Sequence, residues 1–552
     1  MYRNNNHNNN NKIFKILFIF LFIISWLTVK SLEISTNNNI SGIPQESNSN
    51  NSRPNLGYAK LLAYSLYFYE AQRSGKLPSD NRVSWRHDSA LKDGQDVNLD
   101  LIGGYYDAGD YLKFTLPLSW VITSLSWGIL EWGQGYRLAN QSQYIHDMLK
   151  WGTDWLIKAH PESNILYVMI GLDVIDNNYW GPDTSIPYPR PSFNINSTAH
   201  GTDVAGEAAA AFAASSLVFR NYFNDSAYAD ILLSHAKDTY ALAELTPFVL
   251  YQNSVPQIVN VYPSSNFTDE LVWGALWLHR AINNESNNNN SESNYYYLNK
   301  AINYFNNYSM AGQNNVVNWD DKTGAVYLLF ADLIHKYGRE GQEDLSKWKN
   351  EIERYLDGII NLSTCSLTKG GLYWCDEDSK AASLNPALNA AFLLLLYSSL
   401  NVSSSTSTKK IQSYKDFAMS QIDYTLGKNP RNSPYVIGIH PNSPKNPHHG
   451  GASGGNDVSN LNDPPETKYI LYGALVGGPD KKDKFSDDRA DYDETEVALD
   501  YNSPFQNLMA YQVINSYVDP YYVNNNIPKE SSHRITIIKI SGWWENLRKQ
   551  NL

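Results

Sequence analysis

Apolar residues recur at helical spacing along six segments of the chain. The clearest is 118–132, where they fall at positions i, i+3, i+4, i+7, i+11 and i+14 and so share one face of a helix. The same periodicity predicts helices over residues 58–72, 203–219, 269–282, 385–400 and 504–518. Before the last segment, Ser503 as N-cap, Pro504 at N1 and Gln506 at N3 form a capping-box pattern, which predicts where that helix begins.

The order of these segments predicts one all-α domain over residues 54–520. Strand patterns are few and short, and loops rich in Gly, Pro and Asn separate the helices without a linker that would divide the chain. The apolar face of each helical hairpin needs a partner, and a closed ring of hairpins leaves no such face uncovered. We therefore expect a single barrel of helical hairpins, followed by a C-terminal tail over 521–552.

Residues 1–31 have the pattern of a signal peptide. A polar start leads into the 14-residue apolar run Ile16 to Val29, which is shorter than the ~20 residues that span a bilayer. No clean small-x-small cleavage motif follows, so an uncleaved signal anchor is the alternative. Residues 32–53 are rich in Asn and Ser, which is typical of a disordered spacer. Because no later stretch is apolar enough to cross a membrane, we expect a secreted protein with no stable membrane span.

In a protein of the secretory pathway, N-x-S/T sequons are candidate glycosylation sites and cysteines can form disulfides. The two cysteines, Cys365 and Cys375, match neither a C-x-x-C redox pair nor a zinc site. In an oxidising compartment we expect them to form a disulfide that closes a hairpin. We expect N-glycosylation at sequons in the domain, at Asn140, Asn196, Asn224, Asn266, Asn307, Asn361 and Asn401.

The overall composition excludes one class of partner and favours another. Lys plus Arg number 44 against 56 Asp plus Glu, a net charge of −12, which argues against binding to a nucleic-acid backbone. Aromatic residues make up 13% of the chain and charged residues only 18%. Abundant flat rings with few charges are expected where side chains stack on sugars.

The first loop with candidate chemistry runs from Gly103 to Asp110. It carries Asp107 and Asp110, three positions apart and flanked by glycines that permit a sharp turn. Such a pair can hold one water between its carboxylates, one acting as general base. A solvated turn or a calcium loop is the alternative for an isolated D-x-x-D pattern.

Two further loops carry histidines and acids. The segment 444–453 contains His448 and His449 among turn residues, without a third metal ligand at a familiar spacing, so we expect hydrogen bonds to a polar ligand rather than zinc. The segment 485–498 is acidic and would ordinarily be a solvated face. Glu496, however, precedes the apolar residues 497–499, a setting that raises a carboxyl pKa and keeps the group protonated.

Further motifs accompany these loops, and together they resemble one known family. They include Arg190 to Phe193, Gly201 to Glu207, Asp269 to Ala275 and Tyr472 to Pro479. A C-terminal signature is met at every position, by Phe485, Asp487, Tyr492, Glu496, Ala498, Asn502 and Ser503. From about Tyr58 to Tyr517 the chain resembles glycoside hydrolase family 9, the endoglucanase family, and this resemblance implies an (α/α)6 barrel.

The resemblance implies roles for individual residues. Asp110 matches the catalytic base, Asp107 the carboxylate that helps hold the attacking water, and Glu496 the general acid. His448 and Asp487 match further active-site positions. Residues that resemble the substrate-binding cleft are Trp180, Trp319, Tyr373, Trp374 and His449. For each aromatic residue of this set, packing within a loop is the alternative.

The family implies no cofactor for the chemistry and a structural calcium ion, for which Asp203 and Glu207 are the candidate ligands. The alternative for these two acids is that they complement the dipole of a helix N-terminus. The chain also departs from the family pattern: Gly450 stands where an arginine is usual, His440 and Pro434 replace small residues, and Thr495 replaces an asparagine.

We therefore expect a monomeric, inverting endo-β-1,4-glucanase whose partner is a β-1,4-glucan such as cellulose. Two alternatives stay open at this point. One is a non-catalytic carbohydrate-binding or wall-associated glycoprotein that kept the cleft, which Gly450 alone favours. The other is an (α/α)6 hydrolase for a different glycan.

Overall fold

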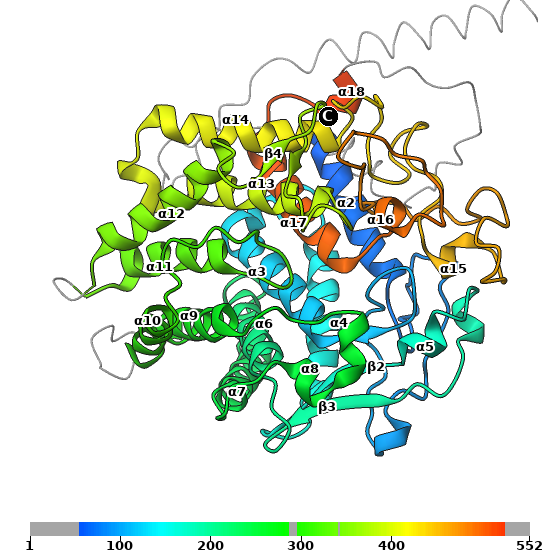
Figure 1. The fold of residues 1–552 in the computed structure, drawn as a ribbon, viewed down its shortest axis with the longest axis horizontal. Coiled ribbons are helices and arrows are strands. Elements are labelled where there is room, and N and C mark those ends of the chain that lie inside the picture. The colour runs from blue at the N-terminus through cyan, green and yellow to red at the C-terminus, as the bar shows by residue number, and fades with distance from the viewer. Residues whose placement is uncertain (1–53, 286–294, 340–342, 525–552) are drawn as a thin grey trace, which may run out of the picture. The chain divides into compact units, whose positions relative to one another are not determined.

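Six long helices form a closed ring in the computed structural model of the protein (Figure 1). They are α3 (Thr115–Leu138), α6 (Thr202–Asn221), α9 (Thr268–Glu285), α11 (Thr323–Tyr337), α13 (Leu384–Ser399) and α17 (Leu499–Asn515). Each packs against the next in this order, and α17 packs against α3. The structure describes residues 54–285, 295–339 and 343–524, and the ring lies entirely within them.

An outer helix packs against each member of the ring. The pairs are α2 (Leu56–Ala71) with α17, α4 (Ser142–Ala159) with α3, α7 (Ser226–Ala243) with α6, α10 (Tyr296–Asn307) with α9, α12 (Leu345–Ile360) with α11 and α14 (Thr408–Thr425) with α13. Outer and inner helices alternate along the chain. This arrangement confirms the predicted all-α (α/α)6 barrel.

Burial separates the inner from the outer helices. Every residue of α6 from Thr202 to Phe219 is buried, so this alanine-rich helix is surrounded on all sides. By contrast, α12 buries a single stripe, made of Trp348, Ile352, Tyr355, Leu356 and Ile359. An amphipathic outer helix over a fully buried inner helix is the pattern expected where one ring encloses another.

The predicted helices coincide with α2, α3, α6, α9, α13 and α17, and the prediction missed the others. Helix α11 is apolar on nearly every side and shows no one-sided periodicity, while α10 and α14 are rich in polar residues. The predicted start of the last helix was also wrong. Helix α17 begins at Leu499 after the N-cap Ala498, so Ser503 and Pro504 lie inside it. Pro504 is the sixth residue of this helix, and the Ser503 hydroxyl donates to the Asp500 carbonyl (3.2 Å), which an amide at position 504 would otherwise bind.

Strands are short, as predicted. β1 (Lys113–Phe114), β2 (Ile165–Ile170) and β3 (Ser192–Asn196) form an antiparallel sheet in this order, with Lys113 opposite Ile170. β4 (Ser366–Leu367) and β5 (Tyr373–Trp374) form a hairpin. The disulfide between Cys365 and Cys375 closes this hairpin, as the sequence predicted.

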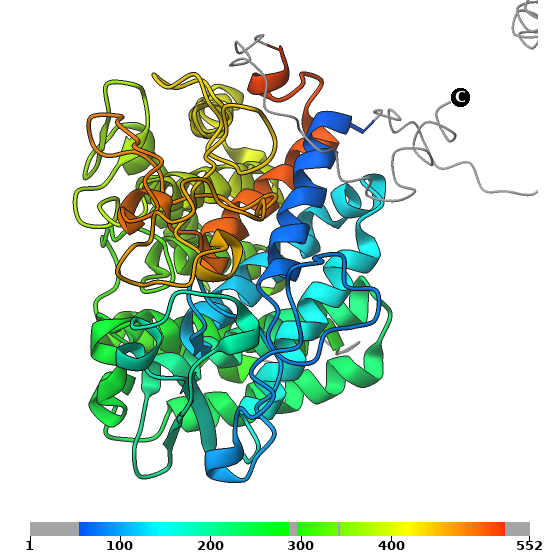
Figure 2. The ribbon, with the colours of Figure 1, turned by 90° about the vertical axis from the view of Figure 1, so that its right-hand side faces the viewer.

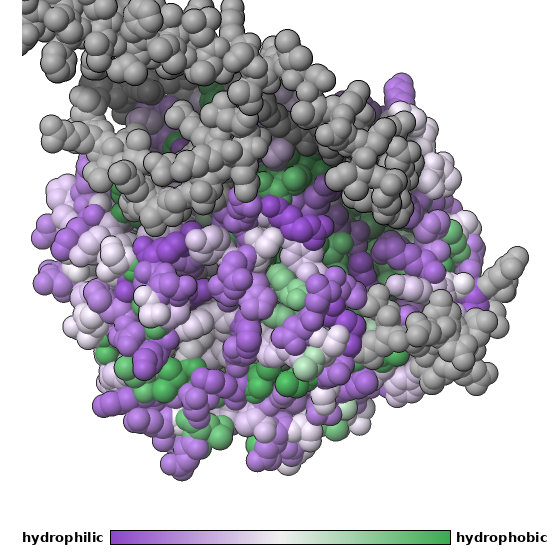
Figure 3. Space-filling view, turned by 180° about the vertical axis from the view of Figure 1, so that it is seen from behind, coloured by the Kyte–Doolittle hydropathy of each residue, from purple (hydrophilic) through white to green (hydrophobic). Residues whose placement is uncertain are grey.

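Short helices and long loops gather on one side of the ring. Figure 1 labels α5 (Asp173–Asp176), α15 (Gly450–Ser453) and α16 (Tyr492–Thr495) on its right, and Figure 2 turns this side toward the viewer. Figure 3 shows the molecule from behind the view of Figure 1, a face with mainly hydrophilic residues and scattered hydrophobic ones. The loops with candidate chemistry therefore share one side of the barrel.

The predicted signal peptide 1–31 and spacer 32–53 lie outside the described residues, as does the tail from position 525. Helix α18 (Tyr521–Asn524) follows the barrel, and Tyr522 packs into the hydrophobic core, so the folded unit extends past position 520. Across the described ranges, no helix combines the length and the hydrophobicity needed to cross a bilayer.

Candidate active site

Asp107 and Asp110 lie on a tight loop that leads directly into β1. The Asp107 amide donates to the Leu112 carbonyl (3.0 Å), and the Leu112 amide donates to Oδ1 of Asp110 (3.1 Å). Asp107 is only 2% exposed, whereas Asp110 is half-buried. The two carboxylates therefore share one rigid loop but differ in their access to solvent.

The loop that carries His448 packs directly on this turn. The Gly450 amide donates to the Gly109 carbonyl (2.8 Å). A Cβ atom on Gly109 would lie 1.9 Å from the His448 carbonyl oxygen. Only glycine lets the two backbones approach so closely.

Backbone pairing brings Glu496 to the same place. His448 and Glu496 form a parallel bridge, and the His448 amide donates to the Thr495 carbonyl (3.0 Å). The Leu499 amide donates to the Asp107 carbonyl (3.0 Å). The three loops that the sequence singled out therefore meet in one site.

Burial and mutual repulsion raise the pKa of all three carboxyl groups. Burial, followed by the charge of Asp500, raises the pKa of Asp107 to about 7. Burial raises the pKa values of Asp110 and Glu496 well above the usual range, and nearby carboxylates add to both shifts. Because charges this close cannot all be ionised, a proton on Glu496 removes one charge and weakens the repulsion that acts on Asp110.

Three residues around these carboxylates were missed in the sequence. The Tyr262 hydroxyl donates to Oδ2 of Asp107. Asp500 is buried and accepts from the side-chain Nδ2 of Asn385 (2.8 Å). Asp176 accepts from the backbone amide of Tyr111 (3.1 Å), and its charge raises the pKa of Asp110. Only Asp500, four positions after Glu496, lies in a motif that points to the site.

His448 is held as a neutral imidazole. Its Nδ1 lies 2.8 Å from the Arg489 carbonyl, so this nitrogen carries the proton and donates it. Burial lowers the pKa of the ring, which favours the neutral form. His448 is half-buried and keeps Nε2 for a ligand, as expected of an active-site residue.

His449 does not fit the predicted contact with substrate, and that expectation was wrong. The ring is 1% exposed, and Nε2 donates to Oε1 of Gln72 (2.9 Å) while Nδ1 accepts from the Ala452 amide (3.0 Å). Gln72 in turn donates to the carbonyl of Ala108 (2.6 Å). His449 therefore supports the Asp107–Asp110 loop from behind.

Asp487 anchors the His448 loop. It has a left-handed backbone, with a φ of 55°, and its carboxylate accepts from the amides of Lys445 (3.0 Å) and Asn446 (3.1 Å). These amides come shortly before His448, so the structure places Asp487 where it positions that histidine.

Comparison with known proteins identifies the family to which this site belongs. The sequence profile described as glycosyl hydrolase family 9 matches residues 58–509, most of the chain. The chain belongs to this family. It is accordingly a glycoside hydrolase, and its (α/α)6 barrel is the fold of the family's structures.

Relatives described as endoglucanases are similar over more than four-fifths of this chain. Endoglucanase A of Bacillus pumilus is 38% identical over 473 residues, 85% of this chain and 68% of that protein. Endoglucanase 14 of Arabidopsis thaliana is 37% identical over 476 residues, 82% of this chain and 93% of that protein.

Solved structures of endoglucanases and cellulases are also similar to this chain in fold and sequence. The endoglucanase of the termite Nasutitermes takasagoensis superposes with a TM-score of 0.74 and 38% identity, covering 83% of this chain and 98% of that one. The cellulase Cel9M of C. cellulolyticum, solved with cellobiose, gives a TM-score of 0.72 at 30% identity with the same coverage.

Two of the aromatic residues matched to the family's cleft lie beside the site. Trp180 packs its ring 5.0 Å from that of His448, between centroids, and is 5% exposed. Trp319 is half-buried and packs edge-on against Tyr262 at 4.8 Å, next to the tyrosine that binds Asp107. Trp180 therefore contacts His448 directly, and Trp319 is linked to Asp107 through Tyr262.

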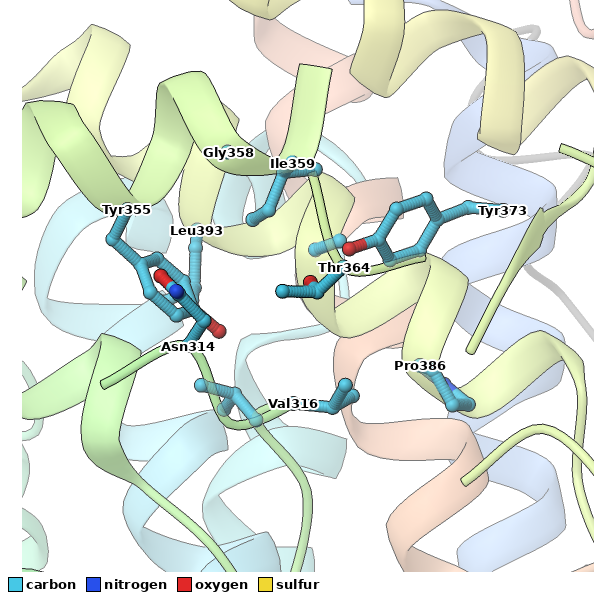
Figure 4. Close-up of a pocket in the computed structure, with 11 residues that line it drawn as sticks. Asn314, Val316, Tyr355, Gly358, Ile359, Thr364, Tyr373, Pro386 and Leu393 are labelled. Atoms are coloured by element: carbon cyan, nitrogen blue, oxygen red, sulfur yellow. The ribbon is translucent and has the colours of Figure 1, made fainter. Parts of the chain in front are cut away.

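Tyr373 and Trp374 are packed differently from the predicted sugar platforms. Tyr373 lines a small cavity of about 10 Å³. Figure 4 shows its ring pointing into this cavity, with Thr364 and Ile359 close by. It belongs to the hydrophobic core, and Trp374 is 5% exposed with its indole N–H donating to Asp376 (2.9 Å). For these two rings the structure supports the alternative, packing within the fold.

The predicted calcium ligands do not fit a cation. Lys322 Nζ lies 3.3 Å from Oε2 of Glu207, so this carboxylate already faces a buried positive charge. Asp203, in the first turn of α6, accepts from the amides of Val204 and Tyr251. In the described residues no group of three or more His, Cys, Asp or Glu could hold a metal ion. For Asp203, the alternative of a helix-terminal acid agrees with its contacts.

Proposed function

We propose that this glycoside hydrolase is an inverting endo-β-1,4-glucanase that cleaves internal bonds of cellulose or a related β-1,4-glucan. One observation carries the proposal: Asp107, Asp110 and Glu496 meet in one site although they come from opposite ends of the barrel sequence. The endoglucanase relatives support the substrate class. No observation favours a non-catalytic protein, and the chemistry needs no cofactor because side chains supply both the acid and the base.

Glu496 acts as the general acid. Burial and the neighbouring carboxylates raise its pKa, which favours the protonated carboxyl. It gives this proton to the glycosidic oxygen as the bond from that oxygen to C1 breaks, so the leaving sugar departs as a neutral alcohol.

Asp110 acts as the general base on the opposite side of the bond. It takes a proton from a water whose oxygen forms the new bond to C1, and attack from this side inverts the anomeric configuration. Asp107, held by the Tyr262 hydroxyl, keeps its Oδ1 free of hydrogen bonds within the described structure. That oxygen accepts the second hydrogen of the water and so fixes its position.

Glu496→Gln tests the proposal. The variant should lose activity on carboxymethylcellulose by about 10²–10⁴-fold, because the leaving oxygen no longer receives a proton. An activated aryl glycoside, whose leaving group needs no proton, should be spared. Reducing-end release and aryl release are the two measurements, and proton NMR should show the α-anomer as the first product from the unmodified protein.

Glu494→Gln is the matched control, because Glu494 lies two positions away and accepts from Ser486 rather than facing the site. Equal loss on both substrates in Glu496→Gln would contradict the role of acid, and an initial β-anomer would contradict inversion.

The proposal includes location: a secreted, N-glycosylated monomer. The disulfide supports an oxidising compartment. The sequon side chains are exposed at Asn140, Asn224, Asn307, Asn361 and Asn401 and half-buried at Asn196 and Asn266. Protein recovered from culture medium should lose mass on enzymatic removal of N-glycans and elute as a monomer; an unchanged mass would contradict glycosylation.

A further inference from the structure

A second cavity lies between α4 and the loop that follows α2. Its volume is about 370 Å³, within the ~300–1,000 Å³ range of small-molecule sites. None of the three catalytic carboxylates, Asp107, Asp110 and Glu496, lines this cavity. This cavity is therefore separate from the catalytic carboxylates.

Arg73 is the residue in this cavity that points to a ligand. It is 5% exposed, its side chain interacts with the Tyr105 hydroxyl, and its buried Nε has no hydrogen-bond partner in the part of the chain that the structure describes. The other cations of the cavity are paired: Arg82 with Glu70, and Lys150 with Asp154 at 2.7 Å. No such ion pair forms between Arg73 and the described carboxylates. A buried guanidinium with free hydrogen-bonding capacity is stabilised by a ligand that brings acceptor oxygens.

The charges around Arg73 favour a neutral, hydroxyl-rich ligand over an anion. The cavity is lined by four carboxylates, from Glu70, Asp80, Asp147 and Asp154, and by three cations, from Arg73, Arg82 and Lys150. The excess of negative charge disfavours a phosphate or an acidic sugar. Sugar hydroxyls suit both sets of groups, since each donates to a carboxylate and accepts from a cation.

Two aromatic rings hold the cationic groups in place. The Arg73 guanidinium lies over the Trp151 ring (5.0 Å to the centroid), and that of Arg82 lies over Tyr144 (3.7 Å). Both rings line the cavity and are half-buried. Stacking restrains the planar donors before any ligand arrives, which lowers the cost of binding.

From these contacts we infer that the cavity is a second, non-catalytic site for a β-1,4-glucan segment. The choice of this saccharide rests on the proposed function, whereas the site itself rests on Arg73 and its surroundings. The site lies directly behind the catalytic loop, because the Trp151 indole donates to the Gly104 carbonyl (2.7 Å) and Arg73 forms a backbone bridge with Tyr105. A chain bound here adds affinity for the polymer without occupying the catalytic carboxylates.

Calorimetric titration with cellopentaose tests the inference. Glu496→Gln serves as the background, so that the ligand survives the measurement, and it should show two classes of binding site. Adding Arg73→Gln should weaken one class by about tenfold or more, since a hydrogen bond to a charged group is lost. Adding Asp147→Asn, at a half-buried position whose side-chain oxygen can still accept from Gln143, should weaken the same class by about threefold.

Matched controls separate the possible causes. Asp230→Asn removes an exposed carboxylate on α7 that pairs with Arg220 outside the cavity, and it should leave both classes intact. Maltopentaose, which has the same sugar in α-linkage, should bind the second class at least about tenfold more weakly. If Arg73→Gln does not fold, the effect of Asp147→Asn on the second class of sites tests the inference.

One class of sites in the background protein would overturn the inference, as would two classes that neither cavity variant changes. Equal binding of maltopentaose would overturn the assignment to β-glucan. Hydrolysis of carboxymethylcellulose by the unmodified protein tests the proposed function separately. A failure of the second site is therefore distinguishable from a failure of the proposed function.

Discussion

Asp500 influences the active site through its charge. It lies in the first turn of α17, where Oδ2 accepts from Asn385 and Oδ1 has no partner among the described residues. Burial raises the pKa of Asp500 to about 7. When ionised, Asp500 raises the pKa of both Asp107 and Glu496. A residue with no assigned part in proton transfer thereby helps to set the pH range in which the acid is protonated.

Asp500→Asn should move the pH profile of kcat/KM toward acid. Glu496 must hold its proton, so activity falls as the pH rises through its pKa, and removing the charge of Asp500 lowers that pKa. The alkaline limb should therefore shift to lower pH. The pKa of Asp107, now about 7, should fall as well, so the carboxylate that holds the water stays ionised to lower pH.

The measurement is kcat/KM on a soluble glucan over a range of pH. Asparagine still offers an oxygen to Asn385, so the packing is kept. Asp493→Asn is the control: its charge also raises the pKa of Glu496, but less than Asp500 does, and its side chain is exposed. An alkaline limb that stays in place in Asp500→Asn would show that this charge is not felt at Glu496.

The active site is assembled by loops that dock through their backbones. The His448 loop lies on the Gly109 turn, Asp487 holds its beginning through the Lys445 and Asn446 amides, and His449 and Gln72 support the turn from behind. The catalytic side chains are therefore positioned by contacts between elements rather than by any one element.

Gly109→Ala should disrupt this docking. The added methyl would lie 1.9 Å from the His448 carbonyl oxygen, so one of the two loops must move. We expect a loss of about 1–3 kcal/mol in stability, as for overpacked sites, and a large fall in kcat because Asp110 and His448 no longer keep their relative positions. Kinetics on a soluble glucan and thermal unfolding give the two values.

Gly358→Ala, in α12, is the matched control, because the nearest atoms to its Cβ lie 4.0 Å away. It should leave kcat unchanged and stabilise the helix by up to ~1 kcal/mol. Unchanged kinetics in Gly109→Ala would mean that the docking of these loops does not position the catalytic groups.

The first and last long helices of the described chain close the barrel. Asn55 caps α2, its Oδ1 accepting from the amides of Gly57 (3.0 Å) and Tyr58 (3.1 Å). Its side-chain Nδ2 donates to the Val518 carbonyl (3.0 Å), just after α17. Its backbone amide donates to the Val513 carbonyl (3.1 Å), within α17. One side chain thus starts the first helix and ties it to the last.

Asn55→Ala should lower the melting temperature more than the loss of an ordinary cap. The cap alone is worth about 0.5–2 kcal/mol, and the lost hydrogen bond to the end of α17 adds about 1 kcal/mol. Asp225→Ala is the control, because the Asp225 carboxylate caps α7 through the amide of Tyr228 (3.0 Å), a residue of that same helix. Equal shifts in the two variants would show that Asn55 acts only as a cap.

The sequence by itself determined the local features of this protein. Periodicity located the inner helices α3, α6, α9, α13 and α17 because their apolar positions recur within a single segment. The Asp107–Asp110 pair and the acidic loop around Glu496 were found for the same reason, because the residues that form each motif lie close together in the sequence. The short spacing between Cys365 and Cys375 likewise predicted the disulfide that closes the β4–β5 hairpin.

Only the tertiary structure decided which side chains meet and which are buried. Tyr262 reaches Asp107 across 155 positions, and His449 reaches Gln72 across 377. Tyr373 became core, and Glu207 gained Lys322 as a buried partner. The physical reason is that these contacts form when the ring of helices closes, and closure depends on packing between faces that lie far apart in the sequence.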